Sequence, residues 1–119
     1  MTKREEFFKP EDAIYTYTSK QAVEDGILFD IDPVQKYLMK NPFKYATVNL
    51  MAKGYLNDNK VNIPNLQDLI MAALMIYCRM PADDYFASGN IELPSGDKQK
   101  IFIAQNETGK FTIMLPEDY

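Results

Sequence analysis

Apolar and polar residues alternate along the C-terminal third of the chain in a pattern that predicts three strands. The segments are 85–93 (YFASGNIEL), 98–105 (KQKIFIAQ) and 110–115 (KFTIML). A period of two places every second side chain on the same face of a sheet. The turn sequences 94–97 (PSGD) and 106–109 (NETG) are short, as in connections between antiparallel neighbours. The pattern therefore predicts an antiparallel meander.

The strongest helical pattern covers about residues 66–79. Its apolar positions recur three and four residues apart, which is the spacing of one helix face; they are Leu66, Leu69, Ile70, Ala73, Leu74 and Tyr77. Met71 and Met75 extend the apolar surface to other faces, so we expect this helix to be the central one. Asn65 is expected to cap its first turn, and Met80-Pro81 to end it.

The first part of the chain predicts a strand, a short helix and a second strand. Residues 13–18 (AIYTYT) alternate aromatic and β-branched side chains, as strands do. Thr18 is expected to cap a short helix, and Gln21, three residues later, completes a capping box. Gly26 is expected to end that helix in a left-handed conformation, before a strand over 27–31 (ILFDI).

Two shorter helices are expected before the long one. Asp32 is expected to cap a helix over 33–40 (PVQKYLMK). Thr47 is expected to cap another over 48–56 (VNLMAKGYL), although Asn41-Pro42 offers an earlier start.

Together these elements predict an α+β fold. The expected architecture is one domain over 13–119, with an antiparallel sheet and three or four helices packed on one face. Residues 57–60 (NDNK) are expected to form a turn. Residues 1–12, which are rich in charge around two phenylalanines, are expected to form a flexible or loosely docked arm.

The composition fits one globular domain. The chain has 119 residues, of which 46% are hydrophobic and 25% charged. Thirteen basic residues against 17 acidic ones give a net charge of −4, which disfavours direct binding of nucleic acid. A single cysteine fits a reducing compartment. No secretory signal and no apolar run of about 20 residues is found, so we expect a cytoplasmic protein that does not enter a membrane.

The chain has no histidine, which removes the commonest general acid–base group and every His-dependent triad or zinc site. No glycine-rich phosphate-binding motif occurs either. Cys78, late in the long helix, is expected to be a buried apolar residue rather than a nucleophile. The sequence therefore indicates a protein that is not an enzyme and holds no cofactor.

The polar residues of 15–32 have two interpretations. In the architectural one, Thr18 and Gln21 cap a helix, Gly26 ends it and Asp32 begins the next helix. In the functional one, Asp25, Asp30 and Asp32 form a carboxylate site, either for catalysis or for calcium or magnesium, since zinc would prefer His and Cys ligands. The spacing matches no EF-hand loop.

Acidic residues also occur in pairs, among them Glu24-Asp25 and Asp83-Asp84. Gathered on one face, they would imitate the phosphates of a nucleic acid; scattered, they would be an ordinary solvated surface. The candidate interaction surface comprises Glu24, Asp25, Asp30, Asp83 and Asp84. Eight tyrosines provide a second source of interface residues.

Residues 14–31 (IYTYTSKQAVEDGILFDI) resemble the N-terminal signature of a small bacterial protein family of unknown function. The family is common on plasmids, integrative elements and phages. The apolar helix and the final segment 111–119 (FTIMLPEDY) resemble it too, whereas 41–60 departs from its pattern. The resemblance implies a bacterial or phage accessory protein and no particular activity.

The function expected from the sequence is a non-catalytic protein–protein interaction module with an unknown protein partner. A narrower hypothesis is an inhibitor of a host defence nuclease that uses its acidic surface as a mimic. The alternatives are a carboxylate- or metal-dependent enzyme using Asp25, Asp30 and Asp32, and a weak nucleic-acid-binding accessory protein. The sequence leaves open whether the chain forms a homo-oligomer.

Overall fold

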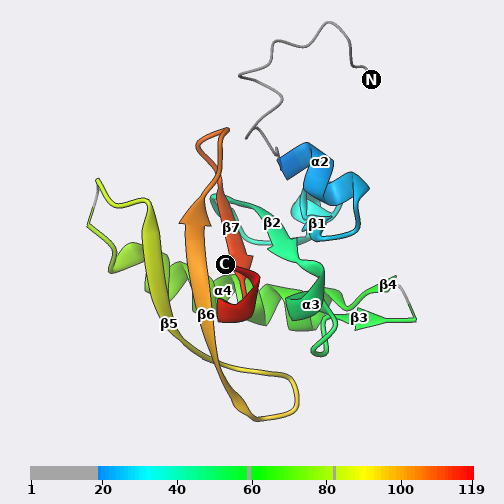
Figure 1. The fold of residues 1–119 in the computed structure, drawn as a ribbon. Coiled ribbons are helices and arrows are strands. Elements are labelled where there is room, and N and C mark those ends of the chain that lie inside the picture. Colours follow the sequence, from blue (N-terminus) through cyan, green and yellow to red (C-terminus); the bar gives the residue numbers. More distant parts are fainter. Residues whose placement is uncertain (1–18, 59, 82) are drawn as a thin grey trace, which may run out of the picture.

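The fold is built around one five-stranded sheet with helical elements on both sides (Figure 1). The structure, a computed structural model, describes residues 19–58, 60–81 and 83–119. In spatial order the strands are β1 (Leu28–Asp30), β2 (Phe43–Thr47), β7 (Phe111–Met114), β6 (Lys98–Gln105) and β5 (Phe86–Glu92). The helical elements are α2 (Ser19–Glu24), η1 (Asp32–Tyr37), α3 (Val48–Met51), α4 (Ile63–Cys78) and η2 (Pro116–Asp118). A separate two-stranded sheet pairs β3 (Leu56–Asn57) with β4 (Lys60–Val61).

The antiparallel meander predicted for the C-terminal third is confirmed. Strand β5 pairs with β6 and β6 with β7, both antiparallel. Ile101 and Ile103 on β6 are completely buried, as is Ile113 on β7. Phe102 lies between the first two and points to the opposite face, because successive strand residues alternate. The sheet therefore has a core face, which carries these isoleucines, and an opposite face that we call the outer face.

Strand β2 was not predicted, and it connects the two halves of the fold. It runs antiparallel to β1 and parallel to β7, where Phe43 lies opposite Phe111 and Ala46 opposite Ile113. The register shifts at Lys44. Only helices were predicted here, because five residues between a proline and a helical turn carry little local signal. Their strand conformation depends on a partner from the far end of the chain.

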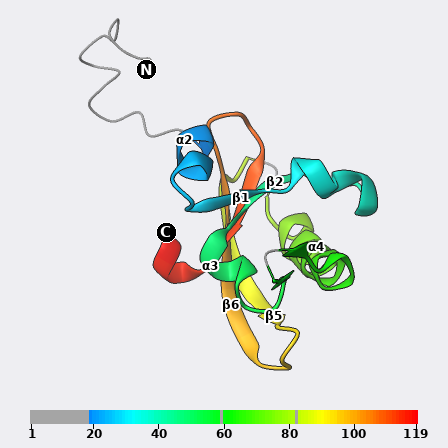
Figure 2. The same ribbon diagram turned by 90° about the vertical axis from the view of Figure 1, so that its right-hand side faces the viewer.

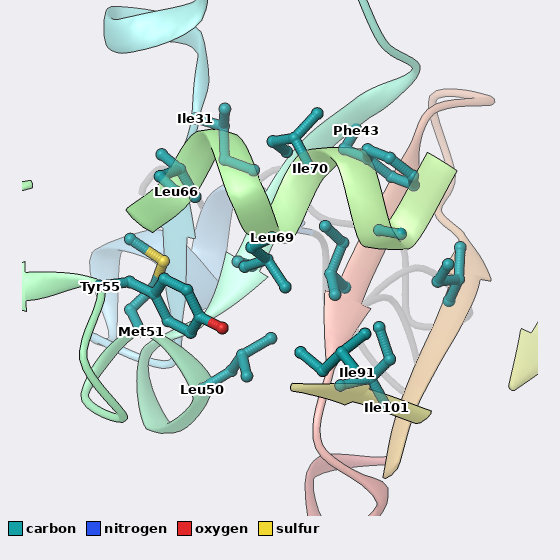
Figure 3. Packing of buried hydrophobic residues seen from close by; sticks show 14 of the residues in the cluster. Ile31, Phe43, Leu50, Met51, Tyr55, Leu66, Leu69, Ile70, Ile91 and Ile101 are labelled. Carbon is teal, nitrogen blue, oxygen red and sulfur yellow. The ribbon is translucent and has the colours of Figure 1, made fainter. Parts of the chain in front are cut away.

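Helix α4 covers the core face of the sheet, and Figure 2 shows the helix on that side of the strands. Its buried side chains are Leu66, Leu69, Ile70, Ala73 and Ile76. In Figure 3 three of them, Leu66, Leu69 and Ile70, lie in one cluster with Ile91 and Ile101 of the sheet. The predicted helix is confirmed, and its apolar stripe forms one side of the core.

Two details of the α4 prediction were wrong. The N-cap is Asn62, whose side chain accepts a hydrogen bond from the backbone N–H of Asn65 at 3.1 Å. Asn65 lies inside the helix and donates through Nδ2 to the carbonyl of Gly54 at 2.9 Å. The helix is also not enclosed on all sides, since Met75 is 60% exposed and Cys78 is exposed. The expectation of a buried Cys78 was therefore incorrect.

The short helix and the strand after it are confirmed. Helix α2 is followed by Gly26 at φ +76°, the left-handed conformation that was predicted to end it. Thr18 lies outside the described residues, as does the side chain of Gln21, so the capping box stays a prediction. The arm expected over 1–12 also lies outside them.

The segment after β1 differs from its prediction. Element η1 is a 3₁₀ helix whose N-cap is Ile31, without a side-chain cap. The expectation that Asp32 caps it was wrong, because the Asp32 carboxylate instead accepts a hydrogen bond from Lys44 Nζ. The helix expected over 48–56 is reduced to α3, and Thr47 at its N-cap position makes no side-chain cap bond. The turn expected over 57–60 falls between β3 and β4, where Asn57 pairs with Lys60, and its residue Asn59 lies outside the described residues.

The predicted α+β class is confirmed, with two refinements. The sheet is mixed, because the β2–β7 pair is parallel. The helical elements divide between the faces, since α4 lies against the core face while α2 and η2 lie on the other side of the sheet (Figures 1 and 2). Within the described residues, no helix has the length and apolar character needed to cross a membrane.

We predict that Gly89→Ala destabilises the protein. A Cβ atom at this position on β5 would lie 2.7 Å from Cδ1 and 2.8 Å from Cγ1 of Ile76 on α4. Overpacking of this kind costs about 1–3 kcal/mol in the free energy of unfolding, measured by urea denaturation. The neighbouring Ser88→Ala should change it by less than about 0.5 kcal/mol. If the contact is the cause, Gly89→Ala combined with Ile76→Ala loses less stability than the sum of the two single changes.

The buried Tyr55 makes the free energy of unfolding fall at alkaline pH. Burial, together with the nearby Asp68 carboxylate, raises the pKa of Tyr55 from 10.0 to about 12. The neutral phenol is therefore favoured by the fold, so this contribution is complete below about pH 10 and is lost as the pH rises towards 12. Between pH 10 and pH 12 the free energy of unfolding of the wild type should fall by about 2 kcal/mol more than that of Tyr55→Phe. Urea denaturation at several pH values measures the difference. Parallel losses in the two proteins would contradict this.

Candidate interaction surface

The carboxylates of Asp30 and Asp32 are brought together, and a lysine lies with them. Lys44 Nζ donates to Asp32 Oδ2 and lies 4.0 Å from Asp30 Oδ1. Asp30 Oδ1 also accepts the backbone N–H of Asp32 at 3.0 Å. The hydrogen bond to Asp32 is the main reason why the pKa of Lys44 is raised. The ammonium group therefore takes the place beside the two carboxylates that a metal ion would need.

The predicted carboxylate site is not assembled as a metal centre in the part of the chain that the structure describes. No three Asp, Glu, Cys or His side chains of these residues are grouped closely enough to hold an ion. Asp25 therefore does not complete a triad with Asp30 and Asp32. The ion pair joins β2 to the segment after β1, and at this degree of exposure it adds little stability.

The two acidic pairs of the candidate surface lie at different edges of the sheet. Glu24-Asp25 leads into β1, and Asp83-Asp84 leads into β5; all four residues are exposed. Strands β1 and β5 are the two edge strands, so four strand spacings of about 4.8 Å, or about 19 Å, separate them. Asp30 lies on β1 and is half-buried. These residues do not form one acidic patch.

An aromatic cluster that the sequence analysis did not identify lies on the outer face. It consists of Phe86 on β5, Phe102 on β6 and the C-terminal Tyr119. The ring centroids are 4.8 Å apart for Phe86–Phe102, 5.0 Å for Phe86–Tyr119 and 5.6 Å for Phe102–Tyr119. Tyr119 is 76% exposed and Phe86 37% exposed. The signal was present in the alternation of β6, because Phe102 stands between two core isoleucines and must face away from them.

An apolar groove continues the aromatic cluster across the outer face. It has a volume of about 270 Å³, and α2 and the η2 segment contribute to its walls. Its lining residues include Ala22, Ile27, Leu28, Thr47, Ala104 and Met114. The strand register connects it to the cluster, since Ala104 lies opposite Phe86 and Met114 opposite Phe102. Cluster and groove therefore form one surface.

The groove is also lined by unsatisfied polar side chains. Three buried side-chain atoms of the described residues lack a hydrogen-bond partner: Thr47 Oγ1, Asn106 Nδ2 and Asp118 Oδ2. All three residues line the groove. Thr47 is only 3% exposed. A buried polar atom without a partner costs about 1–3 kcal/mol, and all three such atoms belong to residues of one groove.

The description of the outer face rests on its residues and their geometry, because comparison with known proteins adds nothing to it. No protein-family model, no curated protein and no solved structure matches this chain. What the geometry provides is an exposed aromatic cluster, an adjoining groove and unsatisfied hydrogen-bonding groups in it.

We predict that Thr47→Val raises the free energy of unfolding by about 1 kcal/mol. The substitution keeps the shape of the side chain and removes a buried hydroxyl that has no partner. Thermal and urea denaturation of both proteins measure the effect. As a control, Thr108→Val should not stabilise, because the Thr108 hydroxyl donates to Asn106 Oδ1 at 2.6 Å. A loss of stability in Thr47→Val would contradict the absence of a partner.

Proposed function

We propose that this protein is a non-catalytic protein–protein interaction module that binds its partner through the outer face of the sheet. The observation that carries the proposal is the exposed cluster of Phe86, Phe102 and Tyr119 beside an apolar groove. Contiguous exposed apolar surface on a small domain is typical of interaction sites. Aromatic side chains contribute a large share of binding energy at such sites, because they bury much area at little conformational cost.

The proposed context is that of a bacterial mobile element or phage, with a cytoplasmic location. It is supported by the resemblance of residues 14–31 and 111–119 to a family of small accessory proteins found there. The second segment contains β7 and ends in Tyr119 of the aromatic cluster. The resemblance supports the setting of the protein and does not specify its partner.

The narrower version of the proposal is inhibition of a host defence nuclease. Glu24-Asp25 and Asp83-Asp84 lie at the two edges of the sheet, so they would contact basic residues at the rim of an interface that covers the groove and the aromatic cluster. Interfaces commonly have this arrangement of a polar rim around a buried core. This version needs the acidic pairs, whereas the general proposal needs only the outer face.

The two alternatives receive less support. A carboxylate- or metal-dependent enzyme built on Asp25, Asp30 and Asp32 conflicts with the position of Lys44, which already forms ion pairs with the last two. A nucleic-acid-binding role conflicts with the net charge of −4, since phosphate contacts require clustered basic residues.

Affinity capture from a nuclease-treated lysate of the native host, followed by mass spectrometry, tests the proposal. The baits are the wild type, Tyr119→Ser and the matched control Tyr37→Ser. Tyr37 is also an exposed tyrosine, at 58%, but it lies in η1, far from the aromatic cluster in sequence. We expect the wild type and Tyr37→Ser to recover the same protein and Tyr119→Ser to recover at least fivefold less, roughly the cost of losing an aromatic anchor.

Equal recovery by all three baits, or no specific protein from any of them, would contradict binding through the outer face. A fourth bait separates the narrower version. It carries Glu24→Gln, Asp25→Asn, Asp83→Asn and Asp84→Asn together. If recovery is lost with this bait as well, the acidic pairs contribute to the interface; if it is unchanged, the partner recognises the aromatic face alone.

A further inference from the structure

The groove on the outer face is of a size that suits one side chain. Its volume of about 270 Å³ lies below the roughly 300–1,000 Å³ of pockets that hold cofactors and drug-sized ligands. Its walls include Ile27, Leu28 and Met114, which offer apolar surface to an aliphatic chain. A ligand for this groove therefore has a slender apolar part.

The charges around the groove select a cation. Glu107 and Asp118 both line it, and no Lys or Arg is among its described lining residues. Asp118 Oδ1 already accepts a hydrogen bond from Asn49 Nδ2 at 2.8 Å, whereas Oδ2 of the same carboxylate has no partner. An ammonium group would donate hydrogen bonds to Asp118 Oδ2 and to Thr47 Oγ1. The bond to the Asp118 carboxylate would be charge-assisted and therefore the stronger of the two.

Asn106 adds a requirement for a hydrogen-bond acceptor. Its Oδ1 accepts bonds from Thr108 N at 2.9 Å, Thr108 Oγ1 at 2.6 Å and Lys110 N at 3.1 Å. These three donors fix the orientation of the amide, so the atom left without a partner, Nδ2, is a donor. An ammonium cannot accept from it, but a peptide carbonyl can. The site thus matches an amine that is part of a polypeptide.

We propose that the groove receives a lysine side chain of the partner protein, with its ammonium on Asp118 and Thr47 and a neighbouring main-chain carbonyl on Asn106. This inference rests on the proposed function, because it names the chemistry by which a partner on the outer face is recognised. The lysine methylenes lie along the apolar walls, as long basic side chains do on apolar surfaces. Lysine fits better than arginine, whose planar fork presents five donors to two acceptors.

Titration of the ¹⁵N-labelled full chain with Nα-acetyl-lysine methylamide, followed by NMR, tests the inference. We expect saturable shifts at the amides of Thr47, Ala104 and Asn106, with a dissociation constant in the millimolar range that is usual for so small a ligand. The norleucine analogue has the same aliphatic stem without the ammonium, so it should give no saturable shift. Free n-butylamine lacks the carbonyl and should bind more weakly than the lysine derivative.

Variants locate the binding. Asp118→Asn removes the charge and should weaken binding about tenfold, while its spectrum shows whether the fold is kept. Thr47→Val removes the hydroxyl in a side chain of the same shape and should weaken binding less. Asp97→Asn, an acid-to-amide change in the exposed turn before β6, should have no effect.

Several outcomes would overturn the inference. These are equal binding of the lysine and norleucine derivatives, unchanged affinity in Asp118→Asn, and the absence of any saturable shift. Contacts from residues 1–18 to the Met114 methyl group, without binding of the probe, would show that the chain fills its own groove. The finding that the unsatisfied atoms bind only water would also overturn the inference.

The failure of this inference is distinguishable from the failure of the proposed function. If Asp118→Asn captures the partner as well as the wild type does, while Tyr119→Ser does not, the outer face binds a partner but its groove takes no lysine. If no bait captures a partner, the proposed function fails independently of the NMR result.

Discussion

The parallel pairing of β2 with β7 holds the two parts of the sheet together. It joins the N-terminal part of the chain to the C-terminal meander, and a parallel pair needs a long connection between its strands. Helix α4 lies within that connection and covers the core face with its apolar stripe. Because α4 covers the core face, the part of the outer face that α2 and η2 leave open can serve another use. Its groove exists only because β2 brings Thr47 onto the sheet that carries Ala104 and Met114.

The two faces of the sheet differ in how completely they are satisfied. On the core face Ile101, Ile103 and Ile113 are fully buried, as expected for residues that stabilise the fold. On the outer face, aromatic rings remain exposed and buried polar atoms lack partners. The unsatisfied atoms cost stability in the isolated protein, and the exposed rings forgo the stabilisation that burial would give them. The exposed rings and the unsatisfied atoms lie together on the outer face, which is consistent with binding through that face.

Much of the fold was predictable from local patterns, and the site was not. The meander and α4 follow from periods of two and of 3.6 residues, and Gly26 ends α2 as expected. β2 was missed because its partner strand lies far away in the sequence. Asp32 was misassigned as a cap because Lys44, twelve residues later, attracts its carboxylate. Asn65 was misassigned because Asn62 caps α4 one turn earlier. The groove could not be predicted, since it combines residues from α2, β2, β6, β7 and the chain end that only the sheet order brings together.

Site-specific photo-cross-linking shows whether a partner binds through the outer face. A photoreactive benzoylphenylalanine replaces Tyr119 in one protein and Tyr37 in another, and each is irradiated in the cells of the native host. We expect a discrete cross-linked protein from position 119 and none from position 37. Cross-linking from position 37 alone, or from neither position, would show that the outer face is not the binding surface.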